Sequence, residues 1–410
     1  MSLSQSWTLD NSNNEVTGDL HQVHLGFPGP IFIAPGESAD EFTLRVTTDT
    51  QAVLDNVELL TELGSPLLQV STGAFDTTKY PDATFLAELT VPSHRLQGIE
   101  CAGEGACVIA AGTHTIEGDL SLKVSGSGSL FVSTDDISAR FITVENIGAG
   151  NVQWTGKRIA AQSLRVSNTG TGAVLISSPV EIVPQVVDVQ VDGKGSVLFS
   201  GKPFNVPIVT SSVTGTGNIT FLPTGVCGTH NISIASKGGV YAGSLKAQNT
   251  SVTITGSGRA VIKSVNALYT NGAGDVTYVS PKPLIVESER SLFNRGPVLT
   301  TDNFYKAFAS LQVPVHEPSK VGAALATEVP TTGVPEVTVP IPSFETSEPM
   351  TDSPKVSQGA GLVPSPTDAA PNDFHGLLWF VGGLGLAIIV VVVLLRRHIA
   401  NKNKGYTPVK

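Results

Sequence analysis

Charged and aromatic residues are scarce in this chain of 410 residues. Only 15% of the residues are charged and 6% are aromatic, whereas a typical soluble domain carries about 25% charged residues. A coiled coil or a long helical array is therefore excluded, because each needs charge along its outer faces. The formal net charge of −10, from 25 basic and 35 acidic residues, would repel phosphate and excludes a basic nucleic-acid-binding protein.

Cysteine is rarer still, since three cysteines are too few for a disulfide-stapled fold. Glycine does not recur at every third position, which excludes a collagen-like chain. Because 40% of the residues are apolar, disorder along the whole chain is excluded too. What the chain has in excess is glycine, with 42 residues, and proline, with 26. This composition is typical of a β-rich chain punctuated by turns, and the length suits one large domain or two ordinary ones.

One long apolar run lies near the C-terminus, from Leu377 to Leu395. Nineteen helical residues at about 1.5 Å each would span about 28 Å, close to the hydrocarbon core of a bilayer. The following tail, 396–410, holds five basic residues and no acidic one, so the part before the run carries 20 basic against 35 acidic residues, a charge of −15. The positive-inside rule then predicts a single-pass protein of the plasma membrane, with a cytoplasmic tail and everything before the run outside.

The N-terminus conflicts with this orientation. Its first residues, MSLSQSWTLDNSNN, have neither the basic start nor the apolar core of a signal peptide. Either a signal peptide is missing from the gene model, or the protein is tail-anchored with its bulk in the cytosol. The charge asymmetry and the composition of the segment before the span favour the missing signal peptide.

That segment, 315–373, is rich in Pro, Thr, Ser, Val and Glu. Recurring prolines forbid helix and disfavour paired strands, so an extended stalk is expected. Ser and Thr beside Pro are typical of O-glycosylated stalks, and an unmodified flexible linker fits the composition equally well. In both cases the segment would hold an N-terminal head away from the bilayer.

The middle of the chain contains an internal repeat marked by Gly-x-Gly pairs. The pairs lie at Gly103/Gly105, Gly126/Gly128, Gly148/Gly150, Gly170/Gly172, Gly193/Gly195, Gly215/Gly217, Gly256/Gly258 and Gly272/Gly274, with a degenerate copy at Ser236/Gly238. Successive spacings are 23, 22, 22, 23, 22, 21, 20 and 16 residues. A nearly fixed period of this length is typical of a solenoid, in which each coil stacks equivalent positions on the next.

Residues around each pair alternate in polarity. Even offsets from the first glycine are mostly apolar and odd offsets mostly polar, for example Val174 and Ile176 at offsets four and six. A period of two predicts strands with one buried face on either side of a glycine turn. Glycine suits such a corner because it accepts positive φ and lets neighbouring backbone come close. The fold class predicted is an all-β parallel β-helix of about nine coils, roughly 40 Å long at ~4.8 Å a coil.

Several side chains of the repeat are candidate sites. Asn146 and Asn168 share one inward offset in adjacent coils and are predicted to bond along the axis as an asparagine ladder. Cys101 and Cys107 occupy even offsets, where they would be small core fillers, with a disulfide between them as the alternative. The glycosylation sequons at Asn218, Asn231 and Asn249 all fall at odd offsets, so their side chains should point outward.

The repeated V-x-G-x-G-x-V signature, together with its flanks, resembles the GIN domain family, also called the auto-transporter adhesin head family. LLQVSTG (67–73) and AELTVPSHRLQGIECAGEG (87–105) match the segments that precede that family's repeats, and NGAGDVTYVSPKP (271–283) is similar to its closing segment. The resemblance covers residues 30–285 and implies a right-handed β-helix at a cell surface. Its implied activity, adhesion, rests on architecture.

The remaining segments are assigned around this head. Residues 1–29 stay unassigned, and strands from about 30 to 92 should close the first end of the solenoid. Residues 286–314 are expected to close the other end, with Asp302 capping a short helix that carries Phe304, Phe308 and Leu311 over the last coil. The full order is then 1–29, the head 30–285, the cap 286–314, the stalk 315–373, the span 377–395 and the tail 396–410.

Catalytic and metal-binding patterns are weak. The acidic residues of the repeats sit at different offsets from coil to coil, so they do not stack into a cleft, and the adjacent Asp135 and Asp136 fit a solvated turn. His21 and His24 lie close together but lack a third ligand, so neither a metal nor another cofactor is predicted. The sequence favours a non-enzymatic, membrane-anchored surface protein that binds glycans or neighbouring surface proteins and no nucleic acid. A self-assembling structural module and a carbohydrate-active enzyme using Asp135 and Asp136 are the alternatives.

Overall fold

The computed structural model describes residues 2–10, 19–73, 75–115, 117–289, 296–300 and 311–320. The chain divides into two compact units, Met1–Glu336 and Val337–Lys410, and the second unit lies wholly outside the described residues. The first unit, the head, is all-β: its described part forms one continuous sheet of 25 strands with one short helix, α2 (Gln51–Leu54).

The strands of the N-terminal end are β1 (Leu3–Asp10), β4 (Glu41–Thr48), β5 (Glu58–Thr61), β6 (Leu67–Ser71) and β7 (Thr84–Pro92). The strands of the coils are β2 (Gln22–Gly26), β3 (Ile31–Gly36), β8 (Gly98–Cys101), β9 (Cys107–Ile109), β10 (Glu117–Val124), β11 (Leu130–Asn146), β12 (Val152–Asn168), β13 (Val174–Ser178), β14 (Glu181–Ile182), β15 (Val186–Val191), β16 (Val197–Gly201), β17 (Phe204–Val213), β18 (Asn218–Phe221), β19 (Gly225–Ile234), β20 (Gly239–Ile254), β21 (Arg259–Gly272), β22 (Asp275–Val279), β23 (Ile285–Ser288) and β24 (Val298–Thr300), and β25 (Ser319–Lys320) follows.

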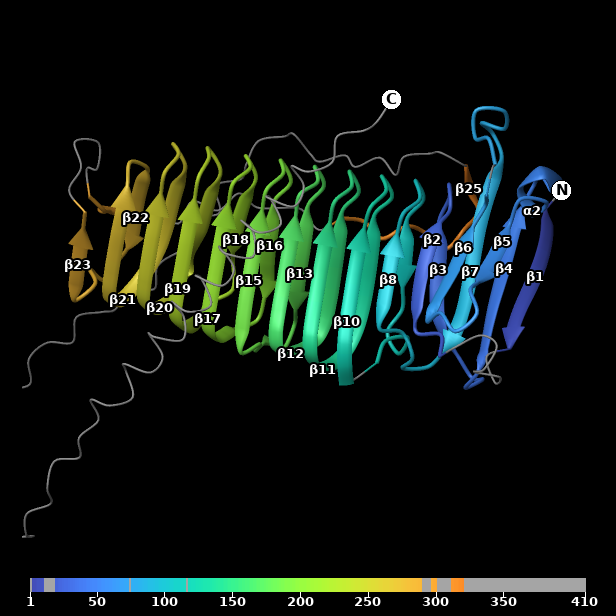
Figure 1. Cartoon of the computed structure of the whole chain (residues 1–410), viewed down its shortest axis with the longest axis horizontal. Helices are drawn as coiled ribbons and strands as arrows, with labels where there is room; N and C mark the ends of the chain where they lie inside the picture. The colour runs from blue at the N-terminus through green and yellow to red at the C-terminus, as the bar shows by residue number, and fades with distance from the viewer. Residues whose placement is uncertain are drawn as a thin grey trace, which may run out of the picture. The chain divides into compact units, whose positions relative to one another are not determined.

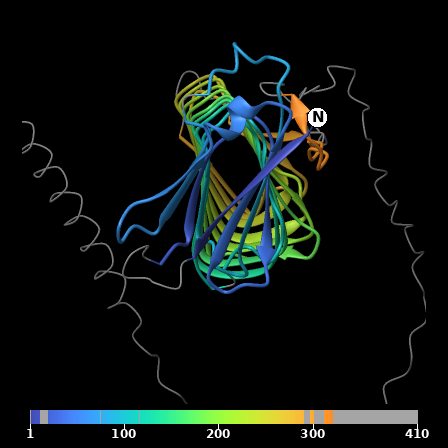
Figure 2. The same ribbon diagram turned by 90° about the vertical axis from the view of Figure 1, so that its right-hand side faces the viewer.

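These strands wind into a β-solenoid of about nine turns, which confirms the coarse fold predicted from the repeat (Figure 1). Each coil has a first face, the strand that leads into the glycine turn, and a second face, the strand that follows it. A corner segment joins the second face back to the first, and the side of the rod formed by these segments is called the corner side. The end-on view shows the two faces meeting at the stacked turns and diverging toward the corner side (Figure 2).

Equivalent positions of successive coils pair in parallel register. One inward ladder on the second face runs from Val132 through Trp154, Ile176 and Phe199 to Phe221. Its side chains are at most 2% exposed, and the rings of Phe199 and Phe221 stack with centroids 5.0 Å apart. Stacking identical inward positions therefore builds one continuous apolar core along the rod.

Close backbone approach, one of the two reasons expected for glycine at the corners, is confirmed. A Cβ on Gly150 would lie 1.9 Å from the carbonyl oxygen of Gly128, and one on Gly172 would lie 1.8 Å from that of Gly150. No side chain can occupy these positions while the turns stay stacked.

Positive φ, the other reason expected, is wrong for every repeat glycine except one. Gly272 has a φ of 103° and pairs with Ile254, two residues before Gly256, so the last Gly-x-Gly pair closes a shorter turn than the others. The other corner glycines do not have positive φ, and they are Gly126, Gly128, Gly148, Gly150, Gly170, Gly172, Gly193, Gly195, Gly215, Gly217, Gly256, Gly258 and Gly274.

The second glycine of several later pairs also differs from the prediction in what excludes a side chain. The sequence pointed only to neighbouring backbone, but at five of these glycines a Cβ would meet an inward side chain of the preceding coil as well. These pairs are Gly195 with Asn168 Nδ2 at 2.7 Å, Gly217 with Val191 Cγ1 at 2.8 Å, Gly238 with Val213 Cγ1 at 2.6 Å, Gly258 with Ile234 Cγ2 at 2.4 Å and Gly274 with Ile254 Cγ2 at 2.2 Å. At these five positions the missing Cβ therefore leaves room for the core of the neighbouring coil and not only for its turn.

Asn146 and Asn168 are paired and fully buried, but the predicted ladder between them is wrong. Asn146 Nδ2 donates to the carbonyl oxygen of Gly150 at 2.9 Å and its Oδ1 accepts from the amide of Gly148 at 3.2 Å. Asn168 Nδ2 donates in the same way to the carbonyl oxygen of Gly172 at 2.8 Å, and also to the Ser196 carbonyl oxygen of the next coil at 3.3 Å. Each amide therefore stabilises its own glycine turn, and only Asn168 bonds along the axis as well.

The first end of the solenoid is closed by antiparallel strands. β4 pairs with β1 on one side and with β7 on the other, and β7 pairs in parallel with β3 of the first coil. α2 buries Val53 and Leu54 at the same end. Residues 1–29, unassigned from the sequence, thus contribute two strands, because β1 extends this cap and β2 pairs with β6 and β8 in the first face.

The chain returns along the head after the last coil. β24 pairs with β22 at the far end, whereas β25 pairs with β7 at the first end. Leu311 was expected to cover the last coil, but its amide donates to Gln153 Oε1 on β12 at 2.9 Å. Asp302, Phe304 and Phe308 lie outside the described residues. In the last coil Leu299, paired with the inward Tyr278, is 53% exposed.

One outward position departs from the predicted polarity. Five residues after the first glycine, on the second face, stand mostly apolar residues such as Phe131, Leu198 and Val261, only 5%, 3% and 1% exposed. The return segment packs on this face: Leu311 meets it at β12, and the His316 ring lies 4.3 Å from that of Phe32. The prediction that odd offsets are mostly polar is therefore wrong at this position of the second face.

No helix among the described residues is long and apolar enough to cross a membrane. The predicted span from Leu377 to Leu395 and the stalk beyond residue 320 lie outside those residues.

Candidate functional site

The first face carries charged side chains that are largely paired with the next coil. Glu100 lies 3.1 Å from Lys123 Nζ and 3.4 Å from His24 Nδ1. Arg165 Nε lies 4.0 Å from Asp188. Such half-exposed pairs contribute little stability, and they leave this face with alternating charge rather than a strong field of one sign.

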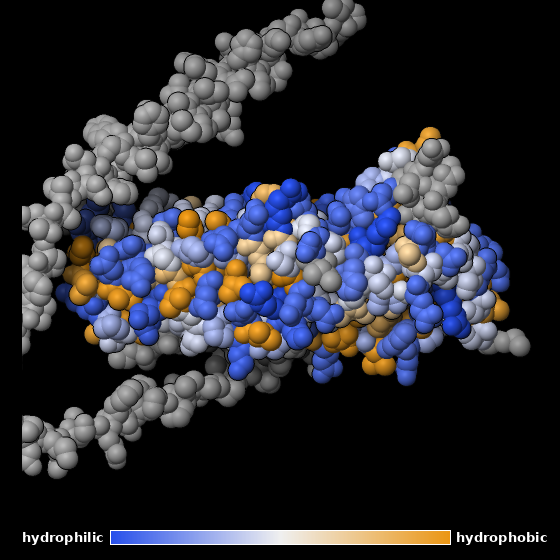
Figure 3. Space-filling model, turned by 90° about the horizontal axis from the view of Figure 1, so that it is seen from below, coloured by the Kyte–Doolittle hydropathy of each residue, from blue (hydrophilic) through white to orange (hydrophobic). Residues whose placement is uncertain are grey.

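The corner side is more varied. Exposed large apolar side chains occur on several of its corner segments, with 43 to 49% of each exposed: Phe141, Val180, Ile208 and Val226. Seen from this side, hydrophobic residues form a broken band along the rod between hydrophilic ones (Figure 3). Arg140 lies over the ring of Phe141 at 5.2 Å while bonding Asp119 at 3.0 Å, so charge and apolar surface alternate on this side as well.

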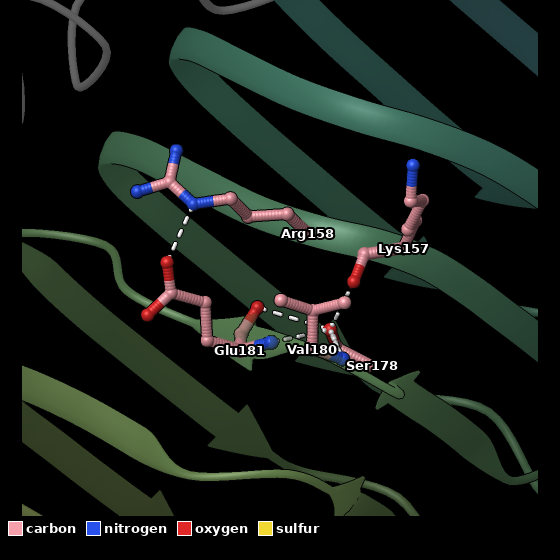
Figure 4. A network of polar contacts seen from close by, with 5 residues as sticks. All are labelled: Lys157, Arg158, Ser178, Val180 and Glu181. Carbon is pink, nitrogen blue, oxygen red and sulfur yellow. Dashed lines mark hydrogen bonds and ion pairs between the residues drawn. The ribbon is translucent and has the colours of Figure 1, made fainter.

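Two coils contain extra residues, and both insertions lie in corner segments. In one, the segment that starts at Ser178 is one residue longer than its neighbour, because Thr155 pairs with Ser177 but Arg158 pairs with Glu181. Ser178 Oγ accepts from the Glu181 amide at 3.0 Å and donates to the Lys157 carbonyl at 2.8 Å (Figure 4). Arg158 Nε donates to Glu181 Oε1 at 2.6 Å. The insertion is thus closed by its own hydrogen bonds.

The other insertion, in the stretch 110–117, forms a pocket. Ile109 pairs with Val132 and Glu117 with Ser138, so this corner holds two more residues than the next one. A shift of register between Gly118 and Leu120 takes one of them back, so the whole coil is one residue longer. The pocket, about 220 Å³ including its open mouth, is lined by His94, Gly112, His114, Thr115, Thr134, Asp135, Asp136 and Ile137. It therefore brings together two histidines and the acidic pair of the next coil, which the sequence places far apart.

His114 forms the buried wall of this pocket, with 4% of its surface exposed. Thr113 Oγ1 donates to the carbonyl oxygen of Ala110 at 2.9 Å and lies 3.0 Å from His114 Nδ1. Because the hydroxyl proton is already used, His114 Nδ1 is the donor in this contact and Nε2 carries a lone pair. Burial lowers the pKa of His114 to about 4, so the ring is neutral, and Nε2 has no hydrogen-bond partner among the described residues.

His94 stands at the exposed rim in a backbone conformation that is uncommon outside glycine, with φ of 56°. Its amide donates to the Gly112 carbonyl at 2.8 Å, and its ring Nδ1 lies 3.2 Å from the His114 carbonyl oxygen. Left-handed backbone at a non-glycine residue costs on the order of 1–3 kcal/mol and persists where surrounding contacts impose it. Here those contacts tie the rim of the pocket to its wall.

Asp135 and Asp136 are exposed as expected, but the turn predicted from the sequence is wrong, because both residues lie within strand β11. They also border the pocket, which the sequence did not reveal. The spacing of 23 rather than 22 residues between Gly103 and Gly126 was the available signal, because a longer repeat must place its extra residues outside the paired strands.

Among the sequons, Asn231 is exposed, while Asn218 and Asn249 are half-buried. The Asn249 side chain accepts a hydrogen bond from Asn266 at 2.9 Å. The hydroxyl-bearing Thr220 of the first sequon is only 2% exposed. Glycosylation therefore stays a prediction at all three positions, with Asn231 the most accessible.

Cys101 and Cys107 form a disulfide across the first glycine turn, the alternative that the sequence left open. Both are buried, so they line the core as well as closing the turn. Cys227 is a free, buried thiol whose pKa burial raises to about 12, which makes it unreactive.

Within the described ranges no group of three or more His, Cys, Asp or Glu side chains is placed to hold a metal ion. His21 and His24 do not converge on one site, because His21 Nδ1 contacts the carbonyl oxygen of Asp19 while His24 pairs with Glu100.

Comparison with solved structures finds matches at low identity and low TM-score. A putative adhesin from Parabacteroides distasonis is 14% identical, with a TM-score of 0.36 over 72% of this chain and 96% of that one. A putative adhesin from Parabacteroides merdae is 13% identical, with a TM-score of 0.36 over 73% and 96%. A putative lipid binding protein from Parabacteroides distasonis is 14% identical, with a TM-score of 0.31 over 73% and 97%.

No family model matches the chain, and no curated protein matches it. The resemblance to the GIN domain family therefore rests on the repeat and its flanking segments alone.

Proposed function

We propose that this is a non-enzymatic surface protein, anchored by residues 377–395, that presents a β-solenoid head on the stalk 315–373 and binds glycans or neighbouring surface proteins. The proposal includes the finer features that the GIN resemblance implies, a right-handed coil and an adhesin-like role. The supporting observation is the path of the chain, because β25 pairs with β7 at the first end of the head. The described part of the chain ends there, at Lys320, so the first residues of the segment 315–373 lie against the head.

A rigid stack of in-register coils keeps its surface ladders at fixed spacing, which suits contact with an extended or repetitive partner.

Protease protection in intact cells tests the orientation. An epitope placed after Gly64, whose Cβ position meets no atom within 4 Å, should be removed by protease added outside, while one on the 396–410 tail should survive until the membrane is permeabilised. A head epitope protected in intact cells would refute the surface location. Binding of the purified chain to a glycan array and to cells tests the ligand class, and no binding in either assay would leave a surface protein without an adhesive role.

A second candidate, self-association, is favoured by the last coil. Leu284, Val298 and Leu299 are 81%, 56% and 53% exposed there. Exposed apolar side chains grouped at one end of a rod favour contact with another copy. Because the opposite end is capped, this would give a closed head-to-head dimer, which sedimentation of the wild type and of Leu299→Glu would detect or exclude.

A further inference from the structure

We propose that the pocket of the 110–117 corner, between His94, His114, Asp135 and Asp136, binds one residue of a saccharide through its hydroxyl groups. The proposal rests on the proposed function, since it assigns the glycan binding of the head to one place. Nothing in the repeat itself predicts this site, because it arises where one coil departs from the repeat.

The chemistry of the ligand follows from the groups that line the pocket. His114 Nε2 carries a lone pair and accepts a hydrogen bond. The carboxylates of Asp135 and Asp136 are acceptors when ionised. Thr134 Oγ1 accepts from Trp154 Nε1 at 2.9 Å, and its hydroxyl proton can still be donated. The pocket therefore offers mainly acceptors, and it suits a ligand rich in donors that can also accept a hydrogen bond. Vicinal hydroxyl groups of a sugar supply several donors at fixed spacing.

The buried histidine is the observation that points to a ligand rather than to a solvated surface. A buried acceptor without a partner costs about 1–3 kcal/mol, and the other ring nitrogen is held by Thr113, so the ring cannot turn its lone pair elsewhere without losing that contact. A hydroxyl group that donates to Nε2 removes this cost.

Charge argues against a simple cation as the occupant. Asp136 pairs in register with Arg158 on the next coil. The pKa of Arg158 is raised by its hydrogen bond to Glu181, by the charge of Glu181 and, least, by the charge of Asp136. Part of the negative charge at the rim is thus balanced, and the described His and Asp groups do not converge on one ion.

The size of the pocket limits the ligand. Most of its ~220 Å³ is open mouth, and the enclosed part has room for about one water-sized group. One hydroxyl group of a sugar fits this space, and the ring and the rest of an oligosaccharide would lie over the exposed rim. Affinity for a single sugar should be weak, with a Kd on the order of 1 mM.

The test is titration of the purified full-length protein with methyl glycosides of hexoses, followed by ligand-observed NMR. Wild type should bind at least one of them. Asp135→Ala combined with Asp136→Ala should weaken that binding at least tenfold, because exposed side chains are removed without disturbing the core. Asp275→Ala, an exposed aspartate on the last coil, is the matched control and should bind like wild type.

His114→Leu tests the buried acceptor itself, since it keeps an apolar volume and removes the lone pair. It should also weaken binding at least tenfold, and circular dichroism checks that it folds; the double aspartate variant answers the question if it does not. No binding of any glycoside to wild type, or equal binding to wild type and both pocket variants, would overturn the proposal. Binding of Ca²⁺ alone, lost in the double variant, with no glycoside binding would overturn it in favour of a cation site.

Sugar binding by the pocket and the surface location of the head are tested independently. A pocket that binds sugar in a protein whose head is protected in intact cells would refute the proposed function alone. An exposed head whose pocket variants keep their glycan binding would refute only the inference about the pocket.

Discussion

A methyl group added to one corner glycine should separate two coils. In Gly172→Ala the new Cβ would lie 1.8 Å from the carbonyl oxygen of Gly150 and 2.5 Å from its carbonyl carbon. Both atoms belong to backbone, so no side-chain rotation relieves the contact. A carbon and a carbonyl oxygen approach to about 3.3 Å, so the two turns must move apart by about 1.5 Å.

That movement breaks the hydrogen bonds between the two turns. The amides of Thr169 and Gly170 donate to the Asn146 carbonyl at 2.9 and 3.0 Å, and the Thr171 amide donates to the Gly148 carbonyl at 3.1 Å. Each bond contributes about 0.5–1.5 kcal/mol net, and leaving a buried group unpaired costs about 1–3 kcal/mol. We therefore expect Gly172→Ala to lower the free energy of unfolding by about 3–5 kcal/mol.

The matched control lies one residue earlier in the same turn. Thr171 is exposed, and its replacement by alanine should change stability by no more than about 0.5 kcal/mol. Far-UV circular dichroism during guanidinium chloride unfolding of the two purified variants measures the difference. If Gly172→Ala unfolds at the same denaturant concentration as Thr171→Ala, close backbone approach is not the reason for glycine at the corners.

Three further outcomes follow from the structure. Asn146→Ala should lower the free energy of unfolding by about 2 kcal/mol in the same assay, because it removes two buried hydrogen bonds to the glycine turn. Reducing the disulfide of Cys101 and Cys107, which are six residues apart, should lower it by about 2 kcal/mol through the gain in chain entropy of the unfolded state, measured with and without reductant. Burial lowers the pKa of His230 to about 3 from 6.5, so the neutral ring's contribution to the free energy of unfolding is complete above about pH 6.5 and is lost as the pH falls toward 3. Between about pH 7 and 4 the free energy of unfolding of the wild type should therefore fall by about 3 kcal/mol more than that of His230→Gln. Equal losses in the two proteins would contradict this.

The repeat was readable because its two signals are local. The glycines recur at the corner, and apolar residues such as Val174 and Ile176 alternate with polar ones beside them. Both the repeat period and the alternation of polarity can therefore be seen in the sequence alone. The reason for the glycines was only half predicted, since their contacts lie about 22 residues away in the neighbouring coil. Whether Asn146 bonds along the axis or within its own turn depends on side-chain geometry that the register alone leaves open.

The candidate pocket was not readable from the sequence. His94 and His114 are joined by backbone contacts between two corner segments, and Asp135 reaches them only because the next coil stacks there. The sequence shows that the repeat from Gly103 to Gly126 is one residue longer than the next. Strand pairing decides in which part of the coil the extra residue lies.

The amino-acid sequence by itself determined that the chain is a stack of β coils with glycine corners, because each coil repeats the same pattern against its neighbours. It also set the apolar run, the basic tail and the proline-rich segment on which the anchored-head hypothesis depends. Tertiary structure alone decided the contacts between distant segments. The pairing of β1 with β4, of β25 with β7 and of Leu311 with Gln153 depends on which strand edges remain free after the coils have stacked, and no local pattern encodes that.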